Sequence, residues 1–295
     1  MDKKLILVTG GAGFIGSHLC KRLAAEGHRV ISLDNYFTGS RENHVPGVEY
    51  REGHTKDIEK LVPETPDLVY HLGEYSRVAP SLNEPDVVFD LNMAGTFGVL
   101  EHWRKRGYKL VYAGSSTKFA DAREDGVEGK NRSPYSWAKA ANTEQVHNYG
   151  RWYDLPYAVA YFYNVYGPGE RAGQFGGAYG TVVETFKQCY LAGRPCPING
   201  TGEQTRAFTH VDDTVDALIH IGEKGSTDEY AISAREVHSL LDLARMFDLE
   251  VEFKPATKST RSSGASDTTK LESLGWQQHH TLQEYVDAIK AMAQK

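Results

Sequence analysis

The sequence predicts an α/β protein built on a doubly wound, parallel β-sheet with a smaller, mixed C-terminal lobe. Short apolar runs alternate with amphipathic segments over the first half of the chain, and a glycine-rich turn follows the first run. A chain of 295 residues can bury a large core, as one α/β domain or as two lobes. Strands are expected at residues 5–8, 29–33, 67–72, 109–113 and 157–162. One helix is expected to follow the glycine turn and end near residue 26, and two others are expected over 86–106 and 134–152.

The second half of the chain differs in composition and in the spacing of its expected elements. Loops rich in glycine and proline cover 163–180, and a helix over 181–192 is followed by another loop. Short strands are expected at 229–232 and 251–253, and helices near 213–223, 235–247 and 281–293. We therefore expect a first domain over residues 1–164 and a smaller lobe over 165–295, with some chain crossing back to the first domain.

Composition excludes several classes of protein. The net charge is −6 and no basic stripe is present, which argues against a nucleic-acid surface. The spacing of Cys20, Cys189 and Cys196 matches no metal motif, and three cysteines cannot all pair within one chain. The N-terminal apolar run is too short for a signal or membrane helix. We expect a cytoplasmic protein with no metal, nucleic-acid or membrane partner.

Glycines follow the first strand at the spacing of a dinucleotide-binding turn. Residues Leu5–Thr9 lead into Gly10-x-x-Gly13-x-x-Gly16, which overlaps a second pattern that begins at Gly11. Such glycines let backbone amides at a helix N-terminus approach a pyrophosphate. The sequence thus predicts a Rossmann-type cofactor site that includes Gly10, Gly13, Phe14, Ile15 and Gly16.

Asp34 ends the second strand, 18 residues after Gly16. A carboxylate at this position can accept hydrogen bonds from ribose hydroxyls and would repel a 2′-phosphate. No basic residue follows immediately, since Asn35, Tyr36 and Phe37 come next. The pattern favours NAD over NADP and places Asn35 at the same site, although Asp34 could also simply terminate the strand.

A tyrosine and a lysine share one face of the helix expected over 134–152. Ser133 can cap that helix and Pro134 suits its first turn, so Tyr135 and Lys139 stand one turn apart. A nearby cation favours a phenolate, which can serve as a general base. Ser115 follows the strand at 109–113, at the sheet edge where chemistry takes place in open parallel sheets. A solvated helix face is the simpler interpretation of the pair when it is taken alone.

Taken together, these motifs resemble the extended short-chain dehydrogenase/reductase family, and within it the NAD-dependent sugar-nucleotide epimerase/dehydratase group. The resemblance runs from Leu5 to about Trp276. It implies that Asn164, in the loop after the strand at 157–162, contacts the substrate diphosphate. It also implies that Arg206 pairs with phosphate, for which its planar fork is suited, whereas an ion pair with Asp212 or Asp213 is the alternative.

The residues directly after Ser115 bear on the reaction. The 4,6-dehydratase branch carries an Asp-Glu pair there, whereas this chain has Ser116 and Thr117. The resemblance then favours a 4-epimerase in which Tyr135 takes the proton of the sugar 4-hydroxyl and NAD takes the C4 hydride. Lys139 would bind the nicotinamide ribose and Ser115 would bond the reacting oxygen.

Three positions bear on the substrate. Gly264 stands where hexose-only members carry a tyrosine, which makes room for an acetamido group, although it could be an ordinary loop glycine. Arg261 could replace a phosphate-binding arginine that the family places nearby. Glu74 stands where relatives have a small apolar residue, so its carboxylate either reaches the nicotinamide or sugar, or pairs with Arg77. UDP is the family's usual carrier.

Other interpretations remain open. They are another NAD-dependent sugar-nucleotide oxidoreductase, a uronic-acid epimerase, a 3,5-epimerising or decarboxylating relative, and a catalytically silent NAD-binding regulator. The resemblance also implies a homodimer formed through the catalytic helix and a role in making precursors of polysaccharides or other glycoconjugates.

Overall fold

The central element of the fold is a seven-stranded sheet, seen in a computed structural model that describes residues 3–119, 129–170, 180–227, 229–256 and 266–293. All neighbours in the sheet are parallel, and the strand order is β11-β6-β5-β4-β1-β2-β3. The order reverses between β1 and β4, which creates the crevice where doubly wound sheets bind ligands. The structure confirms the predicted fold class. The strands are β1 (Leu5–Thr9), β2 (Arg29–Asp34), β3 (Val48–Glu52), β4 (Leu68–His71), β5 (Lys109–Ser115), β6 (Tyr157–Phe162) and β11 (Glu229–Ile232).

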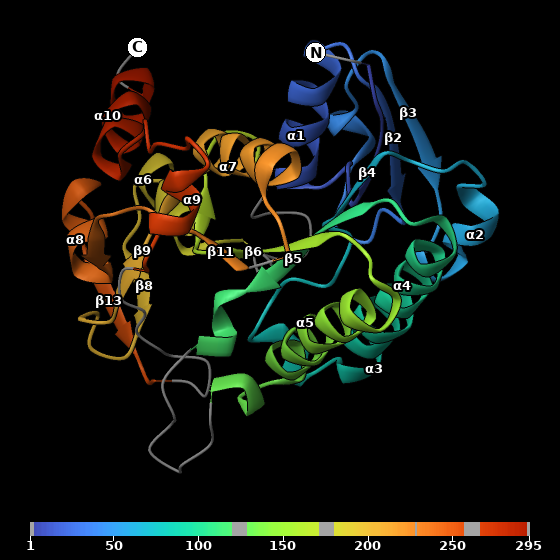
Figure 1. The fold of residues 1–295 in the computed structure, drawn as a ribbon. Helices are drawn as coiled ribbons and strands as arrows, with labels where there is room; N and C mark the ends of the chain where they lie inside the picture. The colour runs from blue at the N-terminus through green and yellow to red at the C-terminus, as the bar shows by residue number, and fades with distance from the viewer. Residues whose placement is uncertain (1–2, 120–128, 171–179, 228, 257–265, 294–295) are drawn as a thin grey trace.

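Helices cover both faces of this sheet (Figure 1). On one face α1 (Phe14–Ala25) and α7 (Val211–Lys224) pack on Ile6 and Val8 of β1. On the other face α4 (Gly95–Arg106) and α5 (Pro134–Tyr153) belong to the core that contains Leu7. Because side chains alternate along a strand, the apolar run of β1 serves both cores at once.

The first half differs from the sequence-based expectation at β3, at the short helix α2 (Ile58–Leu61) and over residues 85–106. The edge strand β3 was not predicted, because it mixes Val48 and Tyr50 with charged residues and is only partly buried. The single helix expected over 86–106 consists of α3 (Pro85–Val88), a π-helical segment (Phe89–Ala94) and α4. π-Helical turns often accompany functional sites, and this one buries Asn92.

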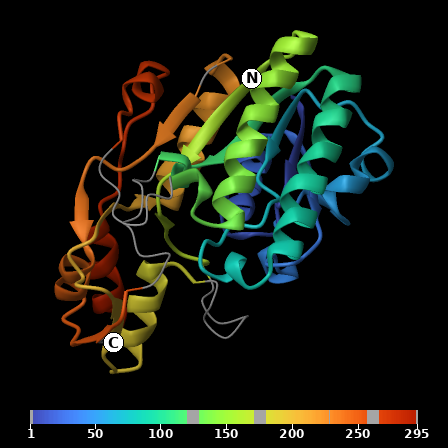
Figure 2. The ribbon, with the colours of Figure 1, turned by 90° about the horizontal axis from the view of Figure 1, so that it is seen from below.

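A smaller lobe packs beside the sheet and has its own apolar core. Seen from below, α4 and α5 run side by side across the sheet while the lobe stands next to them (Figure 2). Instead of the helix expected over 235–247, strand β12 precedes a shorter α8. The lobe contains α6 (Val182–Leu191), β8 (Cys196–Asn199), β9 (Thr205–Ala207), β12 (Val237–Ser239), α8 (Leu240–Met246), β13 (Val251–Lys254) and α10 (Leu282–Ala293).

Short strands and a helix connect the lobe to the sheet. β7 (Val165–Tyr166) pairs with β10 (Thr209–His210), which leads directly into α7. The chain then returns to the main sheet as β11, beside which α9 (Thr269–Ser273) packs. Within the described ranges, none of the helices combines the length and the apolar character that crossing a membrane requires.

Candidate active site

The glycine turn after β1 is packed so closely that side chains would not fit. Gly10 has φ +73°, and a Cβ atom on it would lie 2.8 Å from the Gly73 Cα atom. A Cβ on Gly16 would lie 2.1 Å from the Gly10 carbonyl oxygen. Gly13 begins α1, and no described side chain caps this helix end. Amides of the first turn are therefore available to an anion, as a dinucleotide pyrophosphate requires.

Asp34 closes the same end of the cleft and is buried. Its carboxylate accepts hydrogen bonds from the backbone amides of Ala12 (2.9 Å) and Tyr36 (2.8 Å). Burial raises the pKa of Asp34, and the two backbone hydrogen bonds oppose this effect. Asn35 lines the cleft as well and accepts a hydrogen bond from the Phe37 amide. The glycine cradle, the open helix end and this fixed carboxylate fit a dinucleotide with a free ribose diol.

Tyr135 and Ser115 meet across the cleft. Ser133 caps α5 by accepting a hydrogen bond from the Ser136 amide, and Pro134 occupies the first turn. This start directs the Tyr135 hydroxyl to Ser115 Oγ at 3.1 Å, and both side chains are buried. Ser115 Oγ also lies 2.9 Å from Thr117 Oγ1. The structure thus places the phenol and the serine hydroxyl where one substrate oxygen could contact both.

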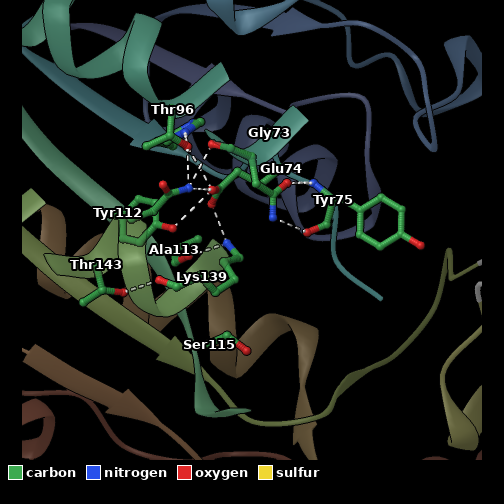
Figure 3. Close-up of polar contacts among 12 residues, drawn as sticks. Gly73, Glu74, Tyr75, Thr96, Tyr112, Ala113, Ser115, Lys139 and Thr143 are labelled. Carbon is green, nitrogen blue, oxygen red and sulfur yellow. Dashed lines mark hydrogen bonds and ion pairs between the residues drawn. The ribbon is translucent and has the colours of Figure 1, made fainter. Parts of the chain in front are cut away.

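Lys139 has a partner that the sequence did not indicate. Its ammonium donates hydrogen bonds to Glu74 Oε2 (2.5 Å) and to the Ala113 carbonyl (2.6 Å), and Figure 3 shows the side chain reaching toward Glu74. The Glu74 side chain is only 1% exposed. Burial is the largest single influence on this group and opposes its ionisation, but the Lys139 ammonium, with further contributions from His71 and Thr96, holds the pKa of Glu74 below its ordinary value. Arg77, the partner considered from sequence, donates hydrogen bonds to Ser76.

Further polar groups hold Glu74 from neighbouring elements. Its Oε1 atom accepts hydrogen bonds from Asn142 (2.8 Å), Thr96 (2.9 Å) and Tyr112 (3.2 Å). Thr96 Oγ1 also contacts His71 Nε2 at 2.9 Å. Burial lowers the pKa of His71 to about 4, so this imidazole is neutral at physiological pH. Sequence reasoning missed this network, because its members come from four separate segments of the chain.

The cleft continues from the glycine turn past Tyr135 to the smaller lobe and encloses about 530 Å³. Asn164 and Arg206 both line its far end, and Asn164 donates a hydrogen bond to the Ala207 carbonyl. The acidic residues considered as partners of Arg206 contact histidines, since Asp212 lies 3.5 Å from His18 and Asp213 lies 2.9 Å from His280. Gly264 and Arg261 lie outside the described residues.

Comparison with known proteins agrees with this geometry. Residues 6–233 match the model of the NAD dependent epimerase/dehydratase family. The chain belongs to that family. Its cofactor is NAD, as predicted, and the fold and the family that the sequence indicated are both confirmed.

Several relatives cover nearly the whole chain. A UDP-glucose 4-epimerase from Mycolicibacterium smegmatis is 32% identical and aligns with 94% of this chain and 95% of its own length. The crystal structure of a UDP-glucose 4-epimerase with UDP-glucose from Thermotoga maritima has a TM-score of 0.88 at 30% identity and covers 98% of this chain and 99% of that chain. UDP-glucuronic acid decarboxylase 1 from Xenopus tropicalis is 28% identical over 96% of this chain and 70% of that protein. The family therefore contains more than one reaction on sugar nucleotides.

Proposed function

We propose that this protein is an NAD-dependent 4-epimerase of a nucleotide-diphosphate sugar, with a UDP-linked hexose or N-acetylhexosamine as substrate. The observation that carries the proposal is the Tyr135–Ser115 hydrogen bond, 3.1 Å long, in the cleft that also contains the glycine turn. Ser115 is followed by Ser116 and Thr117, neither of which is a carboxylic acid for eliminating water. The relatives that act on UDP-glucose support the substrate class.

In the proposed reaction the protein moves one proton and holds one oxygen. Tyr135 removes the proton of the sugar 4-hydroxyl, while Ser115 donates a hydrogen bond to the same oxygen. NAD, when bound, supplies the hydride acceptor and donor for C4. Asn164 and Arg206 retain the diphosphate while the 4-keto sugar turns its other face toward the cofactor. Tyr135 then returns the proton, so sugar and cofactor keep their overall oxidation states.

The assignment of roles along the chain is also part of the proposal. Residues 1–164 bind NAD, and 165–295 supply the substrate end of the cleft, including Arg206. Gly264 and Arg261 stay predictions for sugar and phosphate binding.

The three cysteines are free thiols, which supports a reducing, cytoplasmic setting.

We propose a homodimer formed through the outer face of α5 and its neighbours. Several large apolar side chains are exposed there, although α5 and α4 otherwise bury their apolar residues. Phe89 and Trp137 are 41% and 46% exposed and contact each other edge to face at 5.8 Å. Exposed apolar clusters of this kind mark protein interfaces, and a second copy would cover the face as the family resemblance implies.

Proton NMR can test the reaction directly. Purified protein is incubated, without added NAD(H), with UDP-glucose, UDP-N-acetylglucosamine or UDP-glucuronic acid. Equilibration of one of them with its C4 epimer is expected, and Tyr135→Phe should slow it by about 10²- to 10⁴-fold. Formation of a pentose nucleotide and carbon dioxide, or net reduction of NAD in a parallel incubation with added NAD, would replace the epimerase assignment. Binding without turnover would support the silent regulator.

A further inference from the structure

A buried carboxylate, Glu74, lies next to Lys139 in the cleft, at a position where the family resemblance leads us to expect a small apolar residue. We propose that Glu74 is a positioning residue that holds Lys139 and keeps the proton-transfer cluster of Glu74, Lys139 and Tyr135 electrically neutral while the phenol is protonated. The inference rests on the proposed role of Tyr135 as proton acceptor.

Four hydrogen bonds hold the Glu74 carboxylate in the site. Oε2 is occupied by the Lys139 ammonium, and Oε1 accepts three hydrogen bonds. The carboxylate is almost fully buried, and Lys139 itself is only 5% exposed. A buried charge that loses its partner is costly, so each member of this pair fixes the other.

Asn142, one of the three donors to Glu74, is fixed in turn by the π-helical segment. Asn142 Nδ2 also donates to the Asn92 carbonyl at 2.9 Å. The Asn92 side chain accepts a hydrogen bond from the Tyr75 amide (2.6 Å) and donates one to the Tyr75 carbonyl (3.2 Å). The residue after Glu74 is thereby tied to the same segment as the donor, which anchors the backbone that carries the carboxylate.

The charges around Glu74 can be counted element by element. From α5 it faces Lys139 and the uncharged Asn142, from β4 His71, and from β5 Tyr112, while α4 contributes the uncharged Thr96; Tyr135 lines the same cleft. Burial lowers the pKa of His71 and raises that of Tyr112 well above 10, so both are neutral near pH 7. Among these described groups, the Glu74 carboxylate and the Lys139 ammonium are the two charges, and they cancel.

This balance determines how readily the cluster gives up a proton. With Glu74 ionised, loss of a proton from Tyr135 or Lys139 leaves a net negative charge in a buried site. With an uncharged residue at position 74, the same loss converts a net positive cluster into a neutral one, which is easier in a low-dielectric environment. Glu74 therefore shifts the first ionisation of the Tyr135–Lys139 pair to higher pH, whichever of the two groups releases the proton.

The test is an NMR titration of the apoprotein labelled with carbon-13 at tyrosine Cζ and lysine Cε, with signals assigned from Tyr135→Phe and Lys139→Met. In Glu74→Gln the first proton loss of the pair should occur about 1 to 3 pH units lower than in the wild type, the range that one nearby charge produces. Thr96→Val is the matched control, because it removes a hydrogen bond to Glu74 and keeps the charge; its midpoint should move by less than half that amount.

Equal midpoints in the wild type and Glu74→Gln would overturn the proposal, as would a Thr96→Val shift as large as that of Glu74→Gln. If Glu74→Gln does not fold, Glu74→Ala gives the same comparison with the residue size that the family carries. The titration needs no turnover, so it is separate from the fate of the epimerase assignment. In the active enzyme, the acid limb of the pH–rate profile should move in the same direction as the NMR midpoint.

Discussion

Glu170 gives a stability prediction whose size is set by its surroundings. The side chain lines the cleft and is 7% exposed, and its two oxygens accept hydrogen bonds from the Thr181 amide (2.8 Å) and hydroxyl (2.7 Å). Burial raises the pKa of Glu170 from 4.5 to about 7, although the Thr181 hydrogen bonds and the Arg77 charge oppose it. The folded protein therefore holds a proton between pH 4.5 and 7 that the unfolded chain releases.

Stability contributed by this carboxyl group is present below pH 4.5 and is lost as the pH rises through 7. One pH unit of displacement corresponds to about 1.4 kcal/mol, so ionised Glu170 lowers the free energy of unfolding by about 3 kcal/mol at pH 8. Glu170→Gln keeps an acceptor for Thr181 and carries no charge. It should be about 3 kcal/mol more stable than the wild type at pH 8, with a much smaller difference at pH 5.

Urea unfolding of both proteins at the two pH values measures this difference. The wild type at pH 5 is the control. At that pH Glu170 is protonated in the folded protein, and a protonated glutamate has a size and hydrogen-bonding capacity similar to those of glutamine. A stability gap that is the same at pH 5 and pH 8 would refute the reasoning, since it would show that the substitution acts through packing and not through charge.

Three further predictions concern the cofactor, the start of α5 and the proposed dimer. Asp34→Ala removes the carboxylate that the Ala12 and Tyr36 amides hold in place. A fluorescence titration should show NAD binding weakened by about 1–3 kcal/mol. Unchanged affinity would show that Asp34 does not contribute to NAD binding. Ser133→Ala deletes the cap of α5 and should lower the free energy of unfolding by about 1 kcal/mol in urea, whereas no loss would mean that Pro134 alone starts the helix. In sedimentation experiments the wild type should be the proposed dimer and Trp137→Glu a folded monomer, and a persisting dimer in the variant would place the interface elsewhere.

Features with local signals were predictable from sequence. The strand, glycine turn and helix at the start of the chain depend on neighbouring residues, and the structure shows why Gly10 and Gly16 allow no side chain. The Ser133 cap and the one-turn spacing likewise placed Tyr135 and Lys139 on one helix face. Such features are set by backbone geometry within a few residues, so a single sequence carries them.

Features set by distant partners were not predictable in this way. β3 was missed because this partly buried edge strand has only Val48 and Tyr50 among charged residues. Glu74 and Lys139 are 65 positions apart, and only the folding of β4 beside β5 and α5 brings them together. The carboxylate could be recognised from sequence as unusual, but its partner was not among those considered. The same holds for the π-helical segment, whose Asn92 is specified by contacts with Tyr75 and Asn142.

The central claim is that the sugar is transiently oxidised at C4, and its most direct test follows the hydrogen atom at that carbon. The sugar nucleotide that the protein epimerises is prepared with deuterium at C4 and converted in ordinary water without added cofactor. Transient oxidation at C4 with return of the same hydride predicts that the product keeps its deuterium at C4. Replacement of that deuterium by solvent hydrogen would contradict the account, because it would show that C4 loses a proton to water instead of exchanging a hydride with bound NAD.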